Sequence, residues 1–270
     1  MNLQNIIDAT GQISQKNPLV LSLTNHVVMN STANALLAIG ASPIMSMEQS
    51  ETAELVAISN AVVLNIGTLN EYFIAHAYMA AKYGKKYHKP VILDPVGVGA
   101  SQIRMEAALK ILSTDAVTII KGNASEIIAL AGSATKSKGV DSLHDTGDAL
   151  DAAKKLAKEY NVCVGISGAT DIIVNSQYIA EIALDVPIMQ KVTGTGCTAA
   201  AICGAYAGVE PDSFTATLSA LAIMSAIGNK ASQQAAGPAS FWVGFLDCLS
   251  HISADDLSDI PNIHVQQYEV

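Results

Sequence analysis

The chain has 270 residues, of which 50% are apolar and only 14% are charged, and its formal net charge is −9. Disordered chains combine low hydrophobicity with dense charge, so this composition excludes an intrinsically disordered protein. Nucleic-acid binding is not expected either, because it needs clustered Lys and Arg, and Arg104 is the only arginine.

Short apolar runs alternate with helical patterns over the first two-thirds of the chain. In chain order the runs predict strands at residues 19–23, 43–45, 61–65, 90–94, 116–120 and 162–166. The patterns between them predict helices at residues 30–39, 51–58, 69–83 and 145–160, with Gly40 and Gly84 ending the first and third. Strands that are apolar on both faces and separated by helices predict an α/β fold, a mostly parallel sheet with helices on both faces.

The pattern changes in the last third of the chain. Runs at residues 171–175 and 178–182, separated by Ser176-Gln177, predict a hairpin, and residues 194–250 are predicted to be helical. No linker or repeat is visible, so we expect a single domain over residues 1–270. The helices within residues 199–228 are apolar all round, which is typical of buried helices. We therefore expect the sparsely charged surface to reflect contact between identical subunits.

No membrane segment or secretory signal is expected. The most apolar region, residues 192–228, is broken by Glu210-Pro211-Asp212 into pieces shorter than the about 20 residues that span a bilayer. The first residues lack a basic region followed by an apolar core. None of the four cysteines forms a C-x-x-C pair, which indicates reduced thiols in a cytoplasmic protein.

Ligands of open parallel sheets bind beyond the carboxyl ends of the strands, so the loops that follow the predicted strands are the candidate site. Asp94-Pro95-Val96-Gly97 places a carboxylate there, although an ordinary turn explains the same residues. Lys121 is suited to meet a phosphate as a point charge. Asn123 and Glu126 fit either a helix-capping pair or oxygen ligands of hydrated Mg²⁺.

Two further segments are candidates. Gly194-Thr195-Gly196-Cys197 precedes a small-residue helix, so its backbone N–H groups form an anion site, unless the glycines serve only a tight turn. Asn25 is suited to hydrogen-bond a substrate and Met45 to form an adaptable apolar wall, although core packing also explains the methionine. No P-loop motif is present, which excludes a P-loop kinase.

The Asp-Pro-Val-Gly loop, the Asn-x-x-Glu pair and the late Gly-x-Gly-Cys helix start, in this order, resemble the ribokinase-like fold. With Thr24-Asn25 the set resembles more closely the hydroxyethylthiazole kinases of thiamine salvage. The resemblance implies transfer of the ATP γ-phosphoryl group to the primary alcohol of the thiazole, with Mg²⁺, in a homotrimer with thiazole sites at subunit boundaries. It places Asn25, Met45 and Gly194 at the thiazole, Lys121, Asn123, Ser167 and Gly196 at ATP, and Asp94 and Glu126 at Mg²⁺ and phosphate.

Cys197 occupies the position at which ribokinase-like enzymes usually carry an Asp base, and a Cys there is familiar in the thiazole kinases. We expect a helix N-terminus to lower the pKa of this thiol, which would let it accept the proton of the alcohol, although bound ATP opposes thiolate formation. Two alternatives stay open at this point. One is a related kinase for a hydroxymethylpyrimidine or pyridoxal-type alcohol, and the other is a non-catalytic nucleotide-binding protein.

Overall fold

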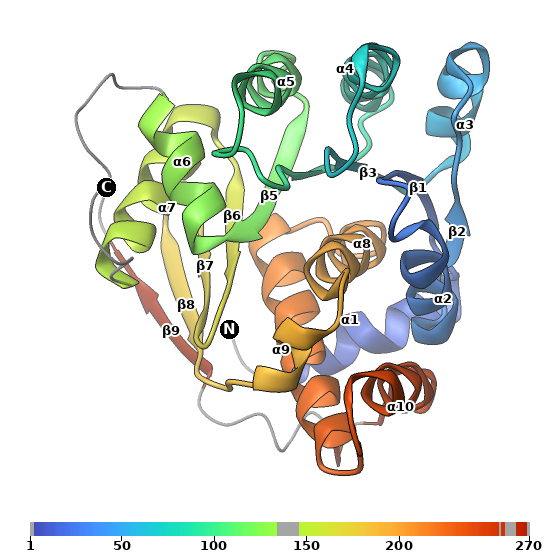
Figure 1. The fold of residues 1–270 in the computed structure, drawn as a ribbon, viewed down its shortest axis with the longest axis vertical. Helices are drawn as coiled ribbons and strands as arrows, with labels where there is room; N and C mark the ends of the chain where they lie inside the picture. Colours follow the sequence, from blue (N-terminus) through green and yellow to red (C-terminus); the bar gives the residue numbers. More distant parts are fainter. Residues whose placement is uncertain (1–2, 134–145, 254, 257–262, 269–270) are drawn as a thin grey trace.

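A single mixed sheet organises the computed structural model, which describes residues 3–133, 146–253, 255–256 and 263–268 (Figure 1). Within these residues the strand order is β2 (Ser42–Ile44), β1 (Leu19–Leu23), β3 (Ala61–Asn65), β4 (Val91–Asp94), β5 (Val117–Asn123), β6 (Cys163–Ser167), β7 (Asp171–Val174), β8 (Tyr178–Ile182) and β9 (Ile263–Gln267). Strands β2 to β6 pair in parallel, and β6 to β9 pair antiparallel. The predicted mostly parallel sheet and the hairpin are therefore confirmed.

Helices cover both faces of this sheet, as predicted, because the buried strands alternate apolar side chains between two cores (Figure 1). One face carries α3 (Thr52–Ile58), α4 (Glu71–Lys86), α5 (Gln102–Leu112), α6 (Ala124–Ser133) and α7 (Thr146–Tyr160). The other carries α1 (Leu3–Lys16), α2 (Met29–Ile39), α8 (Thr195–Ala207), α9 (Ser213–Ser232) and α10 (Pro238–Ser250). Two short 3₁₀ helices, η1 (Gln49–Glu51) and η2 (Pro187–Lys191), lie in connections.

The second face has two layers of helix. Helices α8 and α9 lie directly on the strands, and α1, α2 and α10 cover them from outside. Nearly every residue of α9 up to Gly228 is buried in this way. Burial within one chain thus explains the apolar composition of residues 199–228. The expected contact between identical subunits stays a prediction.

Glycines control two of the predicted helix ends differently. Gly40 ends α2 in the left-handed conformation at φ 94°, as predicted. Gly84 does not end α4, which continues to Lys86. A Cβ at Gly84 would lie 2.5 Å from Cγ2 of Val91, so this glycine instead allows the helix to approach β4 closely.

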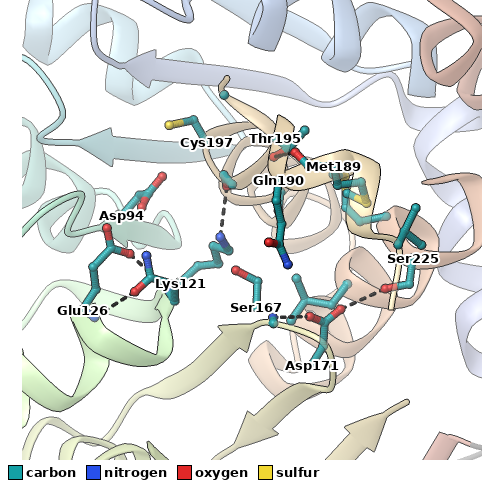
Figure 2. A pocket seen from close by; sticks show the side chains of 18 of the residues that line it. Asp94, Lys121, Glu126, Ser167, Asp171, Met189, Gln190, Thr195, Cys197 and Ser225 are labelled. Carbon is teal, nitrogen blue, oxygen red and sulfur yellow. Dashed lines mark hydrogen bonds between the residues drawn. The ribbon is translucent and has the colours of Figure 1, made fainter. Parts of the chain in front are cut away.

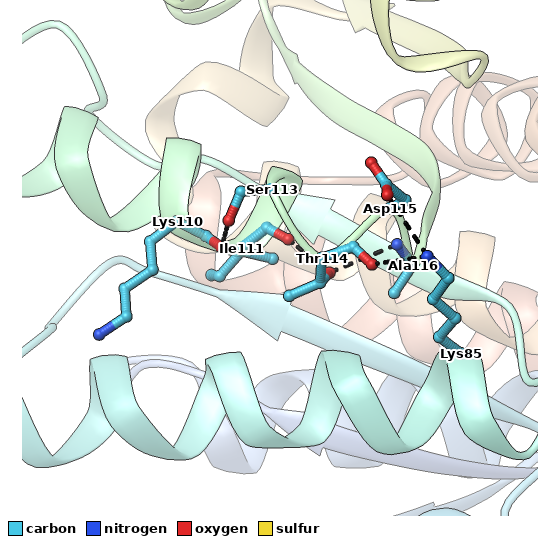
Figure 3. Close-up of polar contacts among 7 residues, drawn as sticks. All are labelled: Lys85, Lys110, Ile111, Ser113, Thr114, Asp115 and Ala116. Carbon is cyan, nitrogen blue, oxygen red and sulfur yellow. Dashed lines mark hydrogen bonds and ion pairs between the residues drawn. The ribbon is translucent and has the colours of Figure 1, made fainter.

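The edge of the sheet at the amino ends of its parallel strands holds a polar turn between α5 and β5 (Figure 3). Lys85 of α4 donates to the carbonyl of Thr114 at 3.2 Å and to the carboxylate of Asp115 at 3.3 Å. Asp115 is left-handed at φ 51°, and the Thr114 hydroxyl donates to the carbonyl of Ile111 at 2.6 Å. These bonds fix the turn from which β5 runs towards the opposite edge.

No helix among the described residues has the length and apolar character needed to cross a bilayer.

Close approach of α8 to the sheet yields a prediction. A Cβ at Gly204 would lie 2.5 Å from Cγ2 of Val63 and 3.1 Å from Cγ1 of Val20. We expect Gly204→Ala to lower the free energy of unfolding by about 1–3 kcal/mol, as overpacking does. Gly11→Ala on α1 is the control, because nothing lies within 4 Å of its Cβ position, and it should raise stability by about 0.5–1 kcal/mol. Urea unfolding measures both, and equal effects would contradict the packing argument.

Candidate active site

A cavity of about 410 Å³ opens at the carboxyl ends of the parallel strands, beside η2 and the start of α8 (Figure 2). Eight of the ten predicted site residues line it: Asp94, Lys121, Asn123, Glu126, Ser167, Gly194, Gly196 and Cys197. They come from distant parts of the chain and meet because parallel pairing brings the ends of β4, β5 and β6 to one edge. The cavity therefore lies at the edge where the site was predicted.

The other two predicted residues lie outside the cavity. Asn25 is buried behind Cys197, and its Nδ2 lies 3.5 Å from the Cys197 Sγ. Met45 follows β2, the outermost parallel strand, at the same carboxyl edge, but β1 and β3 separate β2 from β4, and Met45 is half-buried there. The single chain therefore does not bring Met45 to the other site residues.

Lys121 supplies the cavity with a buried cation. It was predicted to lie in a loop, but β5 continues through Lys121, Gly122 and Asn123, and α6 begins directly afterwards. The side chain is only 2% exposed, and its Nζ donates to the carbonyl of Gly196 at 3.1 Å. Figure 2 shows it between the acidic pair Asp94 and Glu126 on one side and Ser167 on the other.

Glu126 is held by backbone amides. Its Oε2 accepts from the Asn123 N–H at 2.9 Å, while the Asn123 Oδ1 accepts from the Glu126 N–H at 2.9 Å, so the predicted capping pair is confirmed. The other carboxylate oxygen accepts from the Gly97 N–H at 2.8 Å. Glu126 thereby joins the start of α6 to the loop after Asp94.

Asp94 ends β4 with its carboxylate almost completely buried. Its Oδ2 accepts from the Nδ2 of Asn65, which ends β3, at 2.5 Å. The Asn65 Oδ1 accepts from the Nδ2 of Asn25 at 2.9 Å and from the Gly67 N–H at 3.0 Å. Asn65 was not a predicted site residue, although its loop lies at the edge that the topology rule selects.

Burial controls the acid–base state of Asp94. It raises the pKa of Asp94 to about 7, and the Glu126 carboxylate adds to the rise, while the Lys121 ammonium and hydrogen bonds from Asn65 and Cys197 oppose it. Such a carboxylate gains most from a cation placed beside it.

The Cys197 thiol behaves differently from the prediction. Burial, followed by the Asp94 carboxylate, raises the pKa of Cys197 to about 11, against weaker lowering by Asn65, Lys121 and Asn25. The expected lowering at a helix N-terminus is therefore wrong, because desolvation of the thiolate outweighs the helix dipole here. Cys197 is a neutral thiol near pH 7.

The start of α8 has the backbone geometry expected of an anion site. Gly194 precedes the helix in the left-handed conformation at φ 88°, and a Cβ there would lie 2.7 Å from Cγ1 of Val28. The first bond of the helix runs from the Thr198 N–H to the Gly194 carbonyl at 2.8 Å. The N–H groups of the first helical turn before Thr198 have no acceptor within the helix, so they are available to an anion.

The far end of the cavity combines apolar walls with a second buried acid. Leu184, Val186, Met189, Leu221 and Met224 line it. Asp171 accepts from the Gly168 N–H and from the Ser225 hydroxyl, each at 2.9 Å, and burial raises its pKa to about 6. Asp171 and Ser225 were not predicted. Asp171 begins an antiparallel strand, so it lies at the same edge as the end of β6.

Arg104, the only arginine, fastens two loops of the site. Its Nη1 donates to the carbonyls of Ile66 at 3.0 Å and Val96 at 2.7 Å, and its Nη2 donates to the carbonyl of Gly67 at 2.8 Å. The loops after β3 and β4 are thereby held together by one planar donor group.

The donors present suit one kind of metal ion. Among the described residues, no group of three or more His, Cys, Asp and Glu is placed to hold a metal. At the end beside Lys121 the cavity instead offers the carboxylates of Asp94 and Glu126, and burial raises the pKa of Asp94, so a cation beside it would stabilise its charged form. Mg²⁺ keeps several waters and takes one or two carboxylates together with phosphate oxygens, so these residues fit it.

Comparison with known proteins identifies relatives over nearly the whole length. The model of the hydroxyethylthiazole kinase family matches residues 10–255. The chain is 48% identical over 255 residues to a hydroxyethylthiazole kinase of Leptospira biflexa, covering 94% of this chain and 96% of that protein. It is 44% identical over 257 residues to one of Aliivibrio salmonicida, covering 95% and 96%.

Solved structures support the same grouping. A hydroxyethylthiazole kinase from Pyrococcus horikoshii OT3 superposes with a TM-score of 0.90 at 35% identity, covering 98% of this chain and 100% of that one. A pyridoxal kinase of Bacillus subtilis, solved as an ADP complex, reaches a TM-score of 0.58 at 18% identity, covering 78% and 91%. The latter likeness is one of fold alone, and the fold is ribokinase-like.

The buried Asp171 yields a prediction on stability against pH. Its pKa of about 6, against 3.8 for the ordinary side chain, means that the folded state binds the proton more tightly than the unfolded chain. This carboxyl therefore stabilises the fold most below pH 4, and that contribution is lost as the pH rises through 6. Asp171→Asn cannot ionise and keeps an acceptor for the Gly168 N–H. We expect its free energy of unfolding to exceed that of the wild type at pH 8 by on the order of 1–3 kcal/mol and to match it near pH 4.

Asp185→Asn is the matched control for this pH series, because Asp185 lines the same cavity but is exposed. Its substitution should leave the pH dependence unchanged. An Asp171→Asn variant that is no more stable than the wild type at pH 8 would show that the buried carboxyl does not destabilise the fold when it ionises.

Proposed function

The chain belongs to the hydroxyethylthiazole kinase family, and on this basis we propose that it transfers the γ-phosphoryl group of ATP to the primary alcohol of hydroxyethylthiazole. The product is the thiazole phosphate of thiamine salvage. We assign the reaction to one kinase domain over residues 1–270. The observation that carries the proposal is that one cavity gathers the buried Lys121 ammonium, the amino end of α8, the carboxylates of Asp94 and Glu126, and Cys197. Phosphoryl transfer depends on such positioning and neutralisation of charge.

The nucleotide side of the site is assigned to Lys121, Asn123, Ser167 and Gly196. Lys121 neutralises phosphate charge from a buried position, and the amides at the start of α8 stabilise the transferred group. The apolar far end of the cavity suits the nucleobase. Asp94 and Glu126 would hold Mg²⁺, which would neutralise charge on the phosphate oxygens.

The acceptor side is assigned to Asn25, Met45, Gly194 and Cys197. The alcohol oxygen forms a bond to the γ-phosphorus while the bond between that phosphorus and ADP breaks, and the alcohol proton passes to an oxygen of the transferred phosphoryl group. Because the transition state of this reaction is loose, proton removal needs no strong base. A neutral Cys197 thiol therefore acts by orienting the alcohol oxygen beside the amino end of α8.

We assign the active form to a homotrimer with thiazole sites at subunit boundaries. Met45 does not line the cavity within one chain, and two strands separate β2 from β4, so Met45 of a neighbouring protomer completes the site. Apolar side chains that suit such contacts are exposed on α2, on α10 and on the segments that carry Asn25 and Met45, namely Leu37, Val243, Val27 and Met47. The four free cysteines and the use of ATP fit a cytoplasmic enzyme.

A coupled assay of ADP release tests the proposed reaction. With ATP and Mg²⁺, we expect turnover on hydroxyethylthiazole at least about 10-fold faster than on hydroxymethylpyrimidine or pyridoxal, since one extra or missing group in a fitted pocket has about this effect. Release with another alcohol but not the thiazole would assign the chain a different acceptor. Nucleotide binding without turnover on any alcohol would favour a non-catalytic protein.

Substitution of Cys197 tests the assigned role of the thiol. We expect Cys197→Ala to lower kcat by about 10²-fold, the low end of effects on proton-handling groups, because the thiol orients the acceptor rather than removing its proton. Cys197→Asp should retain activity, because it supplies a base at the same place. Thr195→Ser is the control, since its hydroxyl can still donate to the Met189 carbonyl. Unchanged turnover in Cys197→Ala would remove the thiol from the chemistry.

A further inference from the structure

Asn65 lies at the centre of a set of polar side chains at the floor of the cavity, here called the polar ring: Asn25, Asn65, Asp94 and Cys197. The members follow or end β1, β3 and β4 or begin α8. Asn65 is 1% exposed and does not line the cavity. It therefore cannot touch a ligand itself, and any effect that it has on the reaction passes through its neighbours.

Two backbone amides fix the direction of the bonds that the two asparagine side chains make in the polar ring. The Gly67 N–H can only donate, so the atom of Asn65 that faces it at 3.0 Å is the carbonyl oxygen. The Val27 N–H fixes the Oδ1 of Asn25 in the same way at 3.1 Å. The amide nitrogen of Asn65 must then point at Asp94, and that of Asn25 at Asn65 and the Cys197 Sγ.

We propose that Asn65 is a positioning residue of the phosphoryl-transfer site. Its Nδ2 holds the Asp94 carboxylate on the nucleotide side, and its Oδ1 holds Asn25, and through it the Cys197 thiol, on the acceptor side. One amide thus sets the distance between the two halves of the reaction. The inference rests on the proposed function, because only a transfer reaction requires the two halves to keep a fixed distance.

The chemistry of the position requires an amide. Asn65 must donate to a carboxylate and accept from two N–H groups at once, and a carboxylate in its place would put a second negative charge beside Asp94. Outer partners that orient a metal-binding or reacting carboxylate typically change activity by about 10–100-fold when removed. This is the size of effect that a positioning role predicts here.

Kinetics of Asn65→Asp and Asn65→Ala test the proposal. We expect kcat to fall by about 10–100-fold, whereas the affinity for a non-hydrolysable ATP analogue, measured by calorimetry, stays within about 3-fold because no cavity contact is removed. When Asn65→Ala is added to Cys197→Ala, we expect kcat to fall by less than about 3-fold more, because both substitutions disrupt the same polar ring. A residue that only stabilises the fold would instead add its full effect in both backgrounds.

Asn60→Ala is the matched control. Asn60 precedes the same strand at its opposite end and accepts from the Leu19 N–H at 2.9 Å, so it also holds backbone by a side-chain amide. We expect its thermal stability to fall while kcat stays within about 2-fold, since the change lies far from the reacting atoms. The contrast separates loss of stability from loss of positioning.

Gly67→Ala keeps the proposal testable if the Asn65 variants do not fold. A Cβ at Gly67 would lie 2.7 Å from the Nδ2 of Asn25, so the substitution displaces the amide that joins Asn65 to Cys197. We expect a fall in kcat of about 10-fold or more at nearly unchanged nucleotide affinity.

Two outcomes would overturn the inference while leaving the proposed function intact. One is an active wild type with folded Asn65 variants that keep kcat within about 3-fold, and the other is a Gly67→Ala enzyme with wild-type kcat. A wild type that releases no ADP with hydroxyethylthiazole would instead refute the proposed function itself. The two failures are therefore distinguishable in one set of assays.

Discussion

Parallel pairing of β2 to β6 is the constraint on which the rest of the molecule depends. Hydrogen bonding between these strands places the carboxyl end of every one of them at the same edge. The register brings specific residues side by side, since Asn65 pairs with Asp94 and Asn123 pairs with Ser167. The polar groups of the site are thus neighbours because of backbone pairing, and their side chains need only short reaches to meet.

Buried charged groups are concentrated at the same edge of the sheet. Two acids, Asp94 and Asp171, are buried there with raised pKa values, and Lys121 is the cation that opposes the rise at both. An overall charge of −9 is therefore no obstacle to an anionic nucleotide, because the local balance depends on this ammonium and on the amides of α8. The folded protein buries these carboxylates, and a cation bound beside them would stabilise their charged form. This stabilisation would contribute to the binding free energy of the cation.

The sequence predicted those features that depend on one segment at a time. Strands buried on both faces are largely apolar runs, so β1 and β3 were predicted at their observed bounds. Strand β8 was predicted at its observed bounds from the pattern of the hairpin. Strand β9 was not predicted, because its alternation of Ile263 and Val265 with polar residues is too short to differ from a loop until β8 pairs with it. Helices α1 and α5 were also missed, since their apolar residues are spaced among many polar ones.

Features that depend on several segments were the ones that sequence could not supply. The role of Asn65 follows from the adjacency of β3 and β4 in the sheet, and the pKa of Cys197 follows from how deeply its surroundings bury it. Uniformly apolar helices showed that α8 and α9 are buried but not that α1, α2 and α10 bury them.

The enclosure of α8 between the sheet and an outer layer of helices has one more consequence. Residues 198–206 of α8 are buried between these layers, so this helix forms a firmly packed wall of the cavity. The wall formed by η2 is less firmly packed than α8, because η2 is a short 3₁₀ helix and none of its residues is fully buried. Variation in which nucleotide or alcohol the cavity accepts is therefore expected to accumulate in residues 187–191, whereas α8 should tolerate little change among proteins that keep the reaction.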